Sequence, residues 1–245
     1  MTDITPRQIG KLGKLAPVRP VGSRMFAYYQ TSPLPTPPVT VAVPAIQDWG
    51  MLGNDRFGNC TFCGIAHGEM CVAFLNSINE AAPITEQTVS AYLAYTNGQD
   101  QGAVEADLLK YWQANTILSG KAAAYARSDQ SDQMELKAII ACYGFVYIGI
   151  QVPAPCEQQF ANHQPWALTG TPADNNILGG HCIILVGYDE NYFYGITWGE
   201  VQAIEWPWLQ TYMDESWAVI TPEIVTSGKL GDLRIDELIA DIEKL

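Results

Sequence analysis

The chain has 245 residues, of which 48% are hydrophobic and 16% are charged, and its formal net charge is −13. This composition excludes a disordered or collagen-like chain and is sufficient for one large domain or two small ones with a real core. The acidic balance argues against nucleic acid and anionic membranes as partners. We expect no membrane span, because the longest uncharged apolar stretch, residues 138–156, contains two glycines and two prolines.

The N-terminal sequence has no apolar signal core, and six cysteines are too few for a disulfide scaffold. We therefore expect a cytoplasmic protein with reduced cysteines. Residues 1–47 are rich in proline and hold five cations against a single acid, whereas the remainder of the chain is strongly acidic. This arm either lies across its own domain, attracted by opposite charge, or docks a partner subunit or inhibits the functional site.

Helical periodicity dominates the first half of the chain after the arm. The stretch from Cys60 to about Ser77 has small or apolar residues at helical spacing, and Glu69 is its only charged residue. Three further helices are predicted at residues 85–96, 104–115 and 132–142.

The second half has the composition of strands. The runs FVYIGIQV, HCIILVGYD, YFYGITWG and WAVITPE are predicted strands, and the second and third are joined by a short turn. The tail spaces Leu233, Leu238, Ile242 and Leu245 along one stripe, which predicts a terminal helix that packs on the body or on a second subunit. Helices followed by an antiparallel sheet indicate an α+β protein.

One cysteine and one histidine are placed for nucleophilic catalysis. Cys60 follows a Gly- and Asn-rich loop and begins the predicted buried helix, where the helix dipole is expected to lower the pKa of a thiol. A catalytic thiol needs an imidazole to accept its proton. His67 lies two turns along the same helix, too far to touch Cys60, and His163 lies in a loop, but His181 opens a strand directly after two glycines.

Four segments occur in the order found in a known family. Asp48-Trp49, then GNCTFCGIA, GGHCIILVGYDE and YGITWGE together resemble the landmarks of papain-like cysteine peptidases, over residues 48–220. Their variant form is similar to phage and bacterial members. The resemblance implies a papain-like α+β fold with a helical subdomain at 48–140, a β subdomain at 141–225 and a cleft between them. The arm at 1–47 and a C-terminal helix at 226–245 flank this unit; no cofactor is implied, and a phage member would be virion-associated.

The resemblance also assigns roles to residues. Cys60 becomes the nucleophile, His181 its base, and Asn54 the oxyanion donor six residues upstream of Cys60. Ile196 stands where the family has an Asn, so Thr197 is the remaining side chain that can orient His181. Trp198 and Gly180 are expected to contact substrate.

A second alignment with the family's motif makes Cys63 the nucleophile and puts Phe57 at the position of the oxyanion donor. We prefer Cys60, because the side chain of Asn54 can donate an N–H and that of Phe57 cannot.

The resulting hypothesis is a thiol hydrolase that cleaves a peptide or another amide bond. A first alternative, favoured by the missing Asn, is a non-catalytic papain-like phage structural or host-interaction protein. A second is a zinc module, because Cys60, Cys63, His67 and Cys71 share one helix face to which His181 and Cys182 would have to add ligands. The arm or the C-terminal helix is the expected contact of a homo-oligomer.

Overall fold

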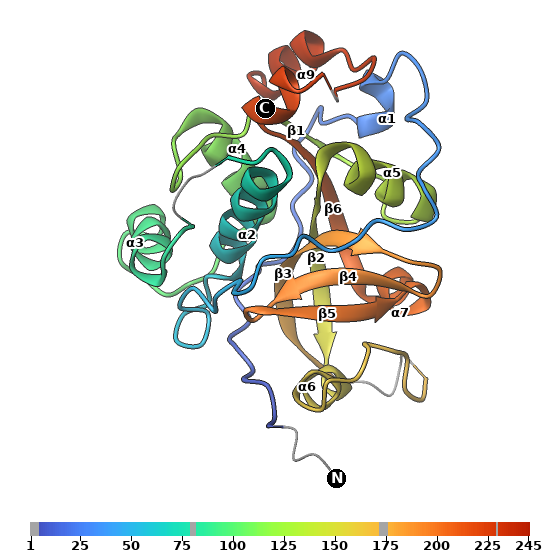
Figure 1. The fold of residues 1–245 in the computed structure, drawn as a ribbon. Coiled ribbons are helices and arrows are strands. Elements are labelled where there is room, and N and C mark those ends of the chain that lie inside the picture. The colour runs from blue at the N-terminus through green and yellow to red at the C-terminus, as the bar shows by residue number, and fades with distance from the viewer. Residues whose placement is uncertain (1–4, 79–81, 172–175, 229) are drawn as a thin grey trace.

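The fold is built on one antiparallel sheet with helices packed against it (Figure 1). The computed structural model describes residues 5–78, 82–171, 176–228 and 230–245. The strands are β1 (Ala124–Arg127), β2 (Val146–Pro153), β3 (Ile177–Tyr188), β4 (Tyr192–Thr197), β5 (Glu200–Glu205) and β6 (Met213–Ile220). Their order across the sheet is β1-β6-β2-β3-β4-β5. The predicted α+β class is confirmed.

The described helices differ widely in length and burial. They are α1 (Phe26–Tyr29), α2 (Cys60–Leu75), α3 (Thr85–Tyr95), α4 (Glu105–Ala114), α5 (Gln133–Tyr143), α6 (Pro155–Ala161), α7 (Trp206–Tyr212), α8 (Pro222–Thr226) and α9 (Ile235–Ile242). None of the described helices is long and apolar enough to cross a membrane. The helices predicted from periodicity correspond to α2, α3, α4, α5 and α9, whereas the shorter ones lack enough turns to show a period.

Helix α2 is the central element, because it packs on β3 and on α3 at the same time. Every residue from Cys60 to Gly68 is buried. Gly64 and Gly68 let the sheet approach: a Cβ at Gly64 would lie 2.8 Å from the Tyr147 ring, and one at Gly68 would lie 2.9 Å from the Phe145 ring. The Tyr147 hydroxyl also donates to the Thr61 carbonyl at 2.8 Å. The N-terminal end of α2 is thereby fixed against β2.

The centre of the sheet carries an irregularity that matters for the site. Strand β2 pairs with β6 so that Gly149 faces Glu215, and the register then shifts, leaving Asp214 unpaired before Met213 meets Ile150. A β-bulge of this kind re-aims side chains on the bulged strand. Asp214 and Glu215 therefore both reach the space next to Gly149.

Four strands of the sheet differ from the prediction. Strand β3 begins at Ile177, so that His181, which was expected to open this strand, lies within it. The strand predicted at residues 217–223 begins earlier, at Met213, and ends at Ile220, because Pro222 starts α8. Strands β1 and β5 were not predicted: β1 is four residues long and pairs with β6, and β5 is six residues long and pairs with β4. Short strands show too few alternations to be recognised.

The N-terminal arm runs along the molecule (Figure 1). Lys14 forms isolated bridges to Ala103 and Gly180, Met25 to Arg127, and Val41 to Tyr188. The terminal helix α9 packs on β1 and on α1 of the same chain.

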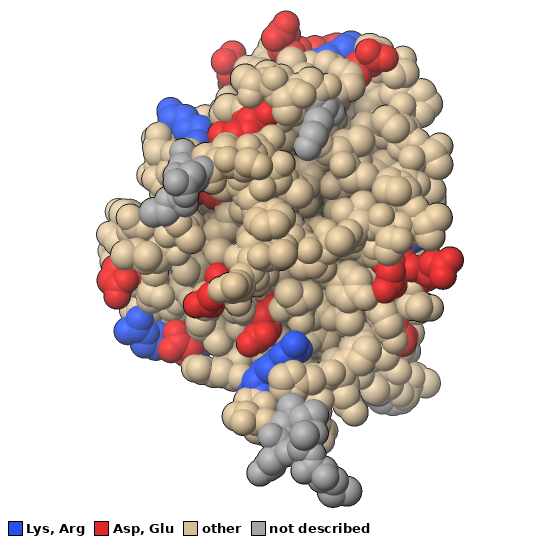
Figure 2. Space-filling view, in the orientation of Figure 1, with Lys and Arg blue, Asp and Glu red and all other residues tan. Residues whose placement is uncertain are grey.

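Charged side chains are spread over the face in Figure 2, with carboxylates more numerous than cations.

Candidate active site

Cys60 begins α2, but its thiol is covered. The side chain is 1% exposed. The loop before it is held by Asn59, whose Nδ2 donates to the Leu52 carbonyl at 2.9 Å, and by Asp100, which accepts from the Gly58 N–H at 2.8 Å. Burial raises the pKa of Cys60 to about 11, although the backbone N–H groups of Cys182 and Gly13 lie against the sulfur and oppose the rise. The expected low thiol pKa is therefore wrong for this arrangement, because burial outweighs the helix terminus.

His181 lies on β3, opposite Ile150 on β2, and is 1% exposed. Its Nε2 is 2.9 Å from Oγ1 of Thr197. Its Nδ1 has no hydrogen-bond partner among the described residues. Burial lowers the pKa of His181 to about 3, so the ring is neutral at physiological pH. One nitrogen is thus held by Thr197 while the other remains available for a proton.

The thiol and the imidazole belong to contacting elements. Helix α2 packs on β3, and the N–H of Cys182, the residue directly after His181, is close enough to the Cys60 thiol to lower its pKa. On the other side of the imidazole, the Trp198 ring lies 5.0 Å from the His181 ring, centroid to centroid. Trp198 is itself buried against Phe160 at 4.8 Å. Trp198 therefore forms a wall beside the histidine.

Asn54 points its amide at a carbonyl of the arm. Its Nδ2 donates to the Lys11 carbonyl and to the Phe57 carbonyl, both at 3.0 Å. In return the Lys11 N–H donates to the Asn54 carbonyl at 2.6 Å. An amide N–H that donates to a carbonyl from another segment of the chain is the kind of group that can also donate to an oxyanion.

Cys63 and His67 contact the loop at residues 49–52. His67 also lies near enough to His181 for its charge to help lower the pKa of that ring. The Cys63 thiol lies 3.8 Å from the Leu52 carbonyl oxygen, and burial raises its pKa well above the usual value. His67 Nε2 lies 3.0 Å from the Trp49 carbonyl and 3.1 Å from that of Gly50. These side chains hold the loop in place. Across the described residues, no three His, Cys, Asp or Glu side chains are arranged to hold a metal ion, so the zinc alternative gains no support.

The arm fills the space above Cys60. The Gly13 carbonyl accepts from the Ala103 N–H at 3.0 Å, and the Lys14 N–H donates to the Gly180 carbonyl at 3.1 Å. Glycines permit this contact: a Cβ at Gly13 would lie 1.9 Å from the Gly58 oxygen, and one at Gly180 would lie 2.4 Å from the Lys14 oxygen. A cavity of about 410 Å³ remains along this stretch of the arm. Gly180, expected to contact substrate, thus contacts the arm.

A group of charged residues beside the thiol was not predicted from the sequence. Glu105, at the start of α4, is fully buried, and its charge contributes to the raised pKa of Cys60. Lys14 from the arm and the pair Asp214 and Glu215 from β6 lie in the same region. Two signals were present: Gly149 interrupts a β-rich run, and two adjacent carboxylates interrupt an otherwise apolar strand.

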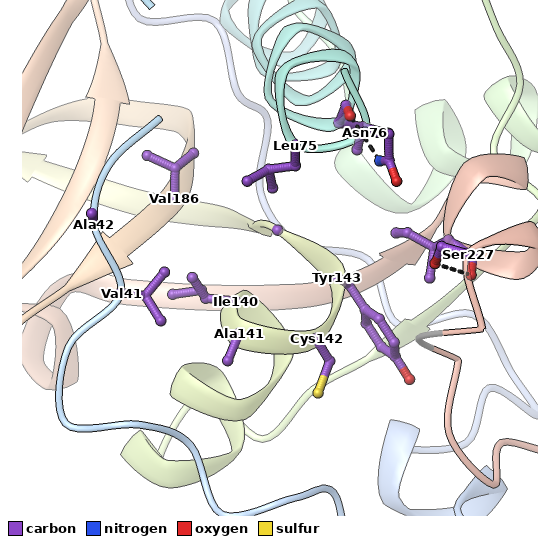
Figure 3. A pocket seen from close by; sticks show the side chains of 13 residues that line it. Val41, Ala42, Leu75, Asn76, Ile140, Ala141, Cys142, Tyr143, Val186 and Ser227 are labelled. Carbon is purple, nitrogen blue, oxygen red and sulfur yellow. Dashed lines mark hydrogen bonds between the residues drawn. The ribbon is translucent and has the colours of Figure 1, made fainter. Parts of the chain in front are cut away.

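A second, apolar pocket lies at the other end of α2 (Figure 3). It has a volume of about 80 Å³ and is lined by Leu75 of α2, Ile140 of α5 and Val41 of the arm, among others. Because α2 is 16 residues long, this pocket is about 20 Å from Cys60. It plays no part in the chemistry at the thiol.

No known family model matches the sequence, and no curated protein matches it significantly. Solved structures do match. Xylellain, a cysteine protease from Xylella fastidiosa, superposes with a TM-score of 0.66 at 16% identity, covering 90% of this chain and 99% of its own. The Amb a 11 cysteine protease, a ragweed pollen allergen in its proform, gives 0.56 at 14% identity over 82% of this chain and 70% of its own. Digestive procathepsin L 3 of Tenebrio molitor gives 0.53 at 14% identity over 88% and 76%. The fold is therefore that of papain-like cysteine proteases.

Proposed function

We propose that this chain is a thiol hydrolase that cleaves a peptide or another amide bond, with Cys60 as nucleophile and His181 as base. The observation that supports the proposal is the way His181 is held next to the strand residue that faces Cys60. Thr197 Oγ1 lies within hydrogen-bond distance of Nε2, Nδ1 has no hydrogen-bond partner among the described residues, and the N–H of Cys182, the next residue, is close enough to the Cys60 thiol to lower its pKa. The phage or bacterial type is part of the proposal, supported by the bacterial origin of xylellain.

The chemistry follows the geometry. His181 Nδ1 takes the proton from the Cys60 thiol, and the thiolate attacks the substrate carbonyl. Asn54 Nδ2 and the Cys60 N–H stabilise the oxyanion, as Asn54 now binds the Lys11 carbonyl. His181 then gives its proton to the leaving amine, and water releases the acyl group from the sulfur. Thr197 positions the ring in place of the family's Asn.

The arm must leave before a substrate can reach Cys60, because Cys60 is buried and the Gly13 N–H of the arm lies near its thiol. Gly13→Val in the full chain forces this movement, since a Cβ at this position would lie 1.9 Å from the Gly58 oxygen. We expect Gly13→Val to hydrolyse members of a pool of fluorogenic peptide amides, and the added change Cys60→Ala or His181→Ala to abolish this turnover. Cys63→Ala in the same background is the matched control and should retain it.

The non-catalytic alternative is favoured by the Ile at position 196 in place of the family's Asn and by the basic arm. Iodoacetamide labelling of Gly13→Val separates the two functions, because it reports whether Cys60 has become accessible. An accessible Cys60 without any amide hydrolysis would overturn the hydrolase proposal and support the non-catalytic module.

A further inference from the structure

Lys14 of the arm is buried in a pocket of carboxylates next to Cys60. Its side chain is completely shielded from solvent, and its Nζ lies 2.9 Å from Oδ1 of Asp214 and 3.1 Å from Oε1 of Glu215. The charge of Glu105 also acts on the Lys14 ammonium and favours its charged form, which raises the pKa of Lys14. Burial pushes the pKa of Lys14 down, but these three carboxylates outweigh burial and the pKa is raised. The pocket therefore holds Lys14 as a cation.

The pocket belongs to the body of the protein and not to the arm. Gly149 provides its floor: a Cβ there would lie 2.0 Å from Lys14 Cε and 2.8 Å from Glu215 Cγ. The β-bulge in β6 directs both carboxylates to this point. They are also held from behind, because Gln151 Nε2 donates to Asp214 and Trp217 Nε1 donates to Glu215 at 3.2 Å. The site is thus shaped and oriented by the sheet.

Glu105 gives independent evidence that this space needs a cation. The residue is fully buried, and its carboxylate oxygens accept no hydrogen bond of normal length from the described residues, although the Cys182 thiol is close enough to lower its pKa. Burial and the charge of Glu215 raise the pKa of Glu105, and Lys14 opposes the rise. A carboxylate in such a place is costly unless a cation accompanies it. With the arm displaced, another cation must replace Lys14 or the pocket must take up protons or water.

The pocket adjoins the proposed reaction centre. Gly13, the residue before Lys14, presents its N–H to the Cys60 sulfur, and the Glu105 charge acts on the same thiol. A side chain one residue away from the group that contacts the sulfur therefore enters the pocket. We propose that this pocket is a specificity site for a lysine side chain of the substrate, and that Lys14 occupies it in the arm-covered form. This inference rests on the proposed function, because a substrate exists only if the chain is a hydrolase. Binding of a cation in the pocket can nevertheless be tested without turnover.

The first experiment is a chemical rescue in the full chain. Lys14→Ala removes the three methylene groups and the ammonium beyond Cβ, which together have the shape of n-propylammonium. We expect this ion to raise the Tm of Lys14→Ala by about 2–4 °C as it fills the pocket. Wild type, whose pocket is filled, should not respond, and neither should Lys14→Ala with Glu215→Gln. The inference would be overturned if 1-propanol raised the Tm of Lys14→Ala as much as propylammonium does, or if propylammonium did not raise it.

A second preparation keeps the test decisive if Lys14→Ala does not fold. Gly13→Val draws the arm away from the cleft and leaves all three carboxylates intact, and propylammonium should stabilise it in the same way. Failure of both proteins to respond counts against the pocket.

The second experiment separates the two proposals. Gly13→Val is assayed with peptide amides that carry Lys, norleucine or Glu at each position on the acyl side of the scissile bond. We expect lysine at one position to raise kcat/KM about tenfold or more over norleucine, and Glu215→Gln to remove the preference. Turnover without a lysine preference overturns this inference and leaves the hydrolase intact. Absence of all turnover, with propylammonium still bound, overturns the hydrolase and leaves the cation pocket.

Discussion

The same arm covers both ends of helix α2, by different physical means. At the N-terminal end, backbone packs on backbone through glycines, and Lys14 is buried among three carboxylates. At the C-terminal end, Val41 lies along Tyr188 with two backbone hydrogen bonds of 2.9 and 3.0 Å and faces an apolar pocket (Figure 3). The first contact depends on a few groups that one substitution can disable. The second is distributed, so that no single side chain decides it.

The largest effect is expected from reversing the charge at the N-terminal contact. Lys14→Glu would place a fourth carboxylate among Asp214, Glu215 and Glu105, where no cation remains to compensate it. We expect a loss of about 3–5 kcal/mol in the free energy of unfolding, or release of the arm with rapid iodoacetamide labelling of Cys60. Urea unfolding and labelling kinetics measure both.

Lys11→Glu is the matched control for that variant. Lys11 lies three residues away on the same arm and pairs with Asp100 at 3.4 Å, but both side chains are partly exposed. Its replacement should cost less than about 1 kcal/mol and leave Cys60 protected. Equal losses of unfolding free energy in Lys14→Glu and Lys11→Glu would show that the buried ion pairs of Lys14 contribute no more to stability than the exposed pair of Lys11.

The comparison also shows where sequence reasoning succeeds. Helices α2 to α5 were predictable because their apolar residues repeat with the helical period, and β2, β3 and β4 because they are β-rich runs bounded by Pro, Gly or Asp. Cys60 at a helix start and His181 after two glycines could be recognised because both signals are local. The contact of His181 with Thr197 was expected from the resemblance, which left Thr197 as the side chain that could orient the ring.

The arm's position and the charged pocket could not be predicted in this way. The pocket joins Lys14, Glu105 and the pair at 214–215, which are far apart in the sequence and meet only through the tertiary fold. The surroundings of Cys60 have the same origin, since the N–H of Gly13 in the arm is close enough to the thiol to lower its pKa. The opposite net charges predicted an attraction between the arm and the body, but they did not predict that Lys14 would make the buried ion pairs.

The second prediction uses the one charge on α2. Glu69 accepts from the Ser119 N–H and hydroxyl at 3.2 and 2.7 Å, yet burial raises its pKa to about 7. Because the folded pKa exceeds the unfolded value of 4.5, its neutral form favours the fold, and this stability is lost as the pH rises from about 4.5 through 7. The loss is at most about 3 kcal/mol.

Glu69→Gln remains neutral at all pH values and isolates this effect. The difference in unfolding free energy between variant and wild type should move in favour of the variant between pH 4.5 and 8, since the other titrating groups cancel. Urea unfolding at both pH values measures it. A constant difference would mean that Glu69 is well solvated and that the C-terminal half of α2 carries no buried charge.

The third prediction sharpens the geometry of the lysine pocket. Gly149→Ala brings a Cβ to within 2.0 Å of Lys14 Cε and should cost about 1–3 kcal/mol through overpacking. Lys14→Ala removes the atoms that clash, so in that background the cost of Gly149→Ala should become smaller. A double-mutant cycle by urea unfolding measures the coupling, and strict additivity would place Lys14 elsewhere.

The smallest effect is expected at the C-terminal contact. Val41→Ala removes two methyl groups from a half-buried side chain, while the backbone bonds between Val41 and Tyr188 are unaffected. We expect a loss of about 1 kcal/mol or less and no change in the labelling rate of Cys60, because the arm stays seated at Gly13. Val39→Ala, at a position 67% exposed, is the control and should be neutral. Faster labelling in Val41→Ala would mean that the two contacts open together, and the arm would then be a single cooperative unit that the lysine pocket alone does not hold.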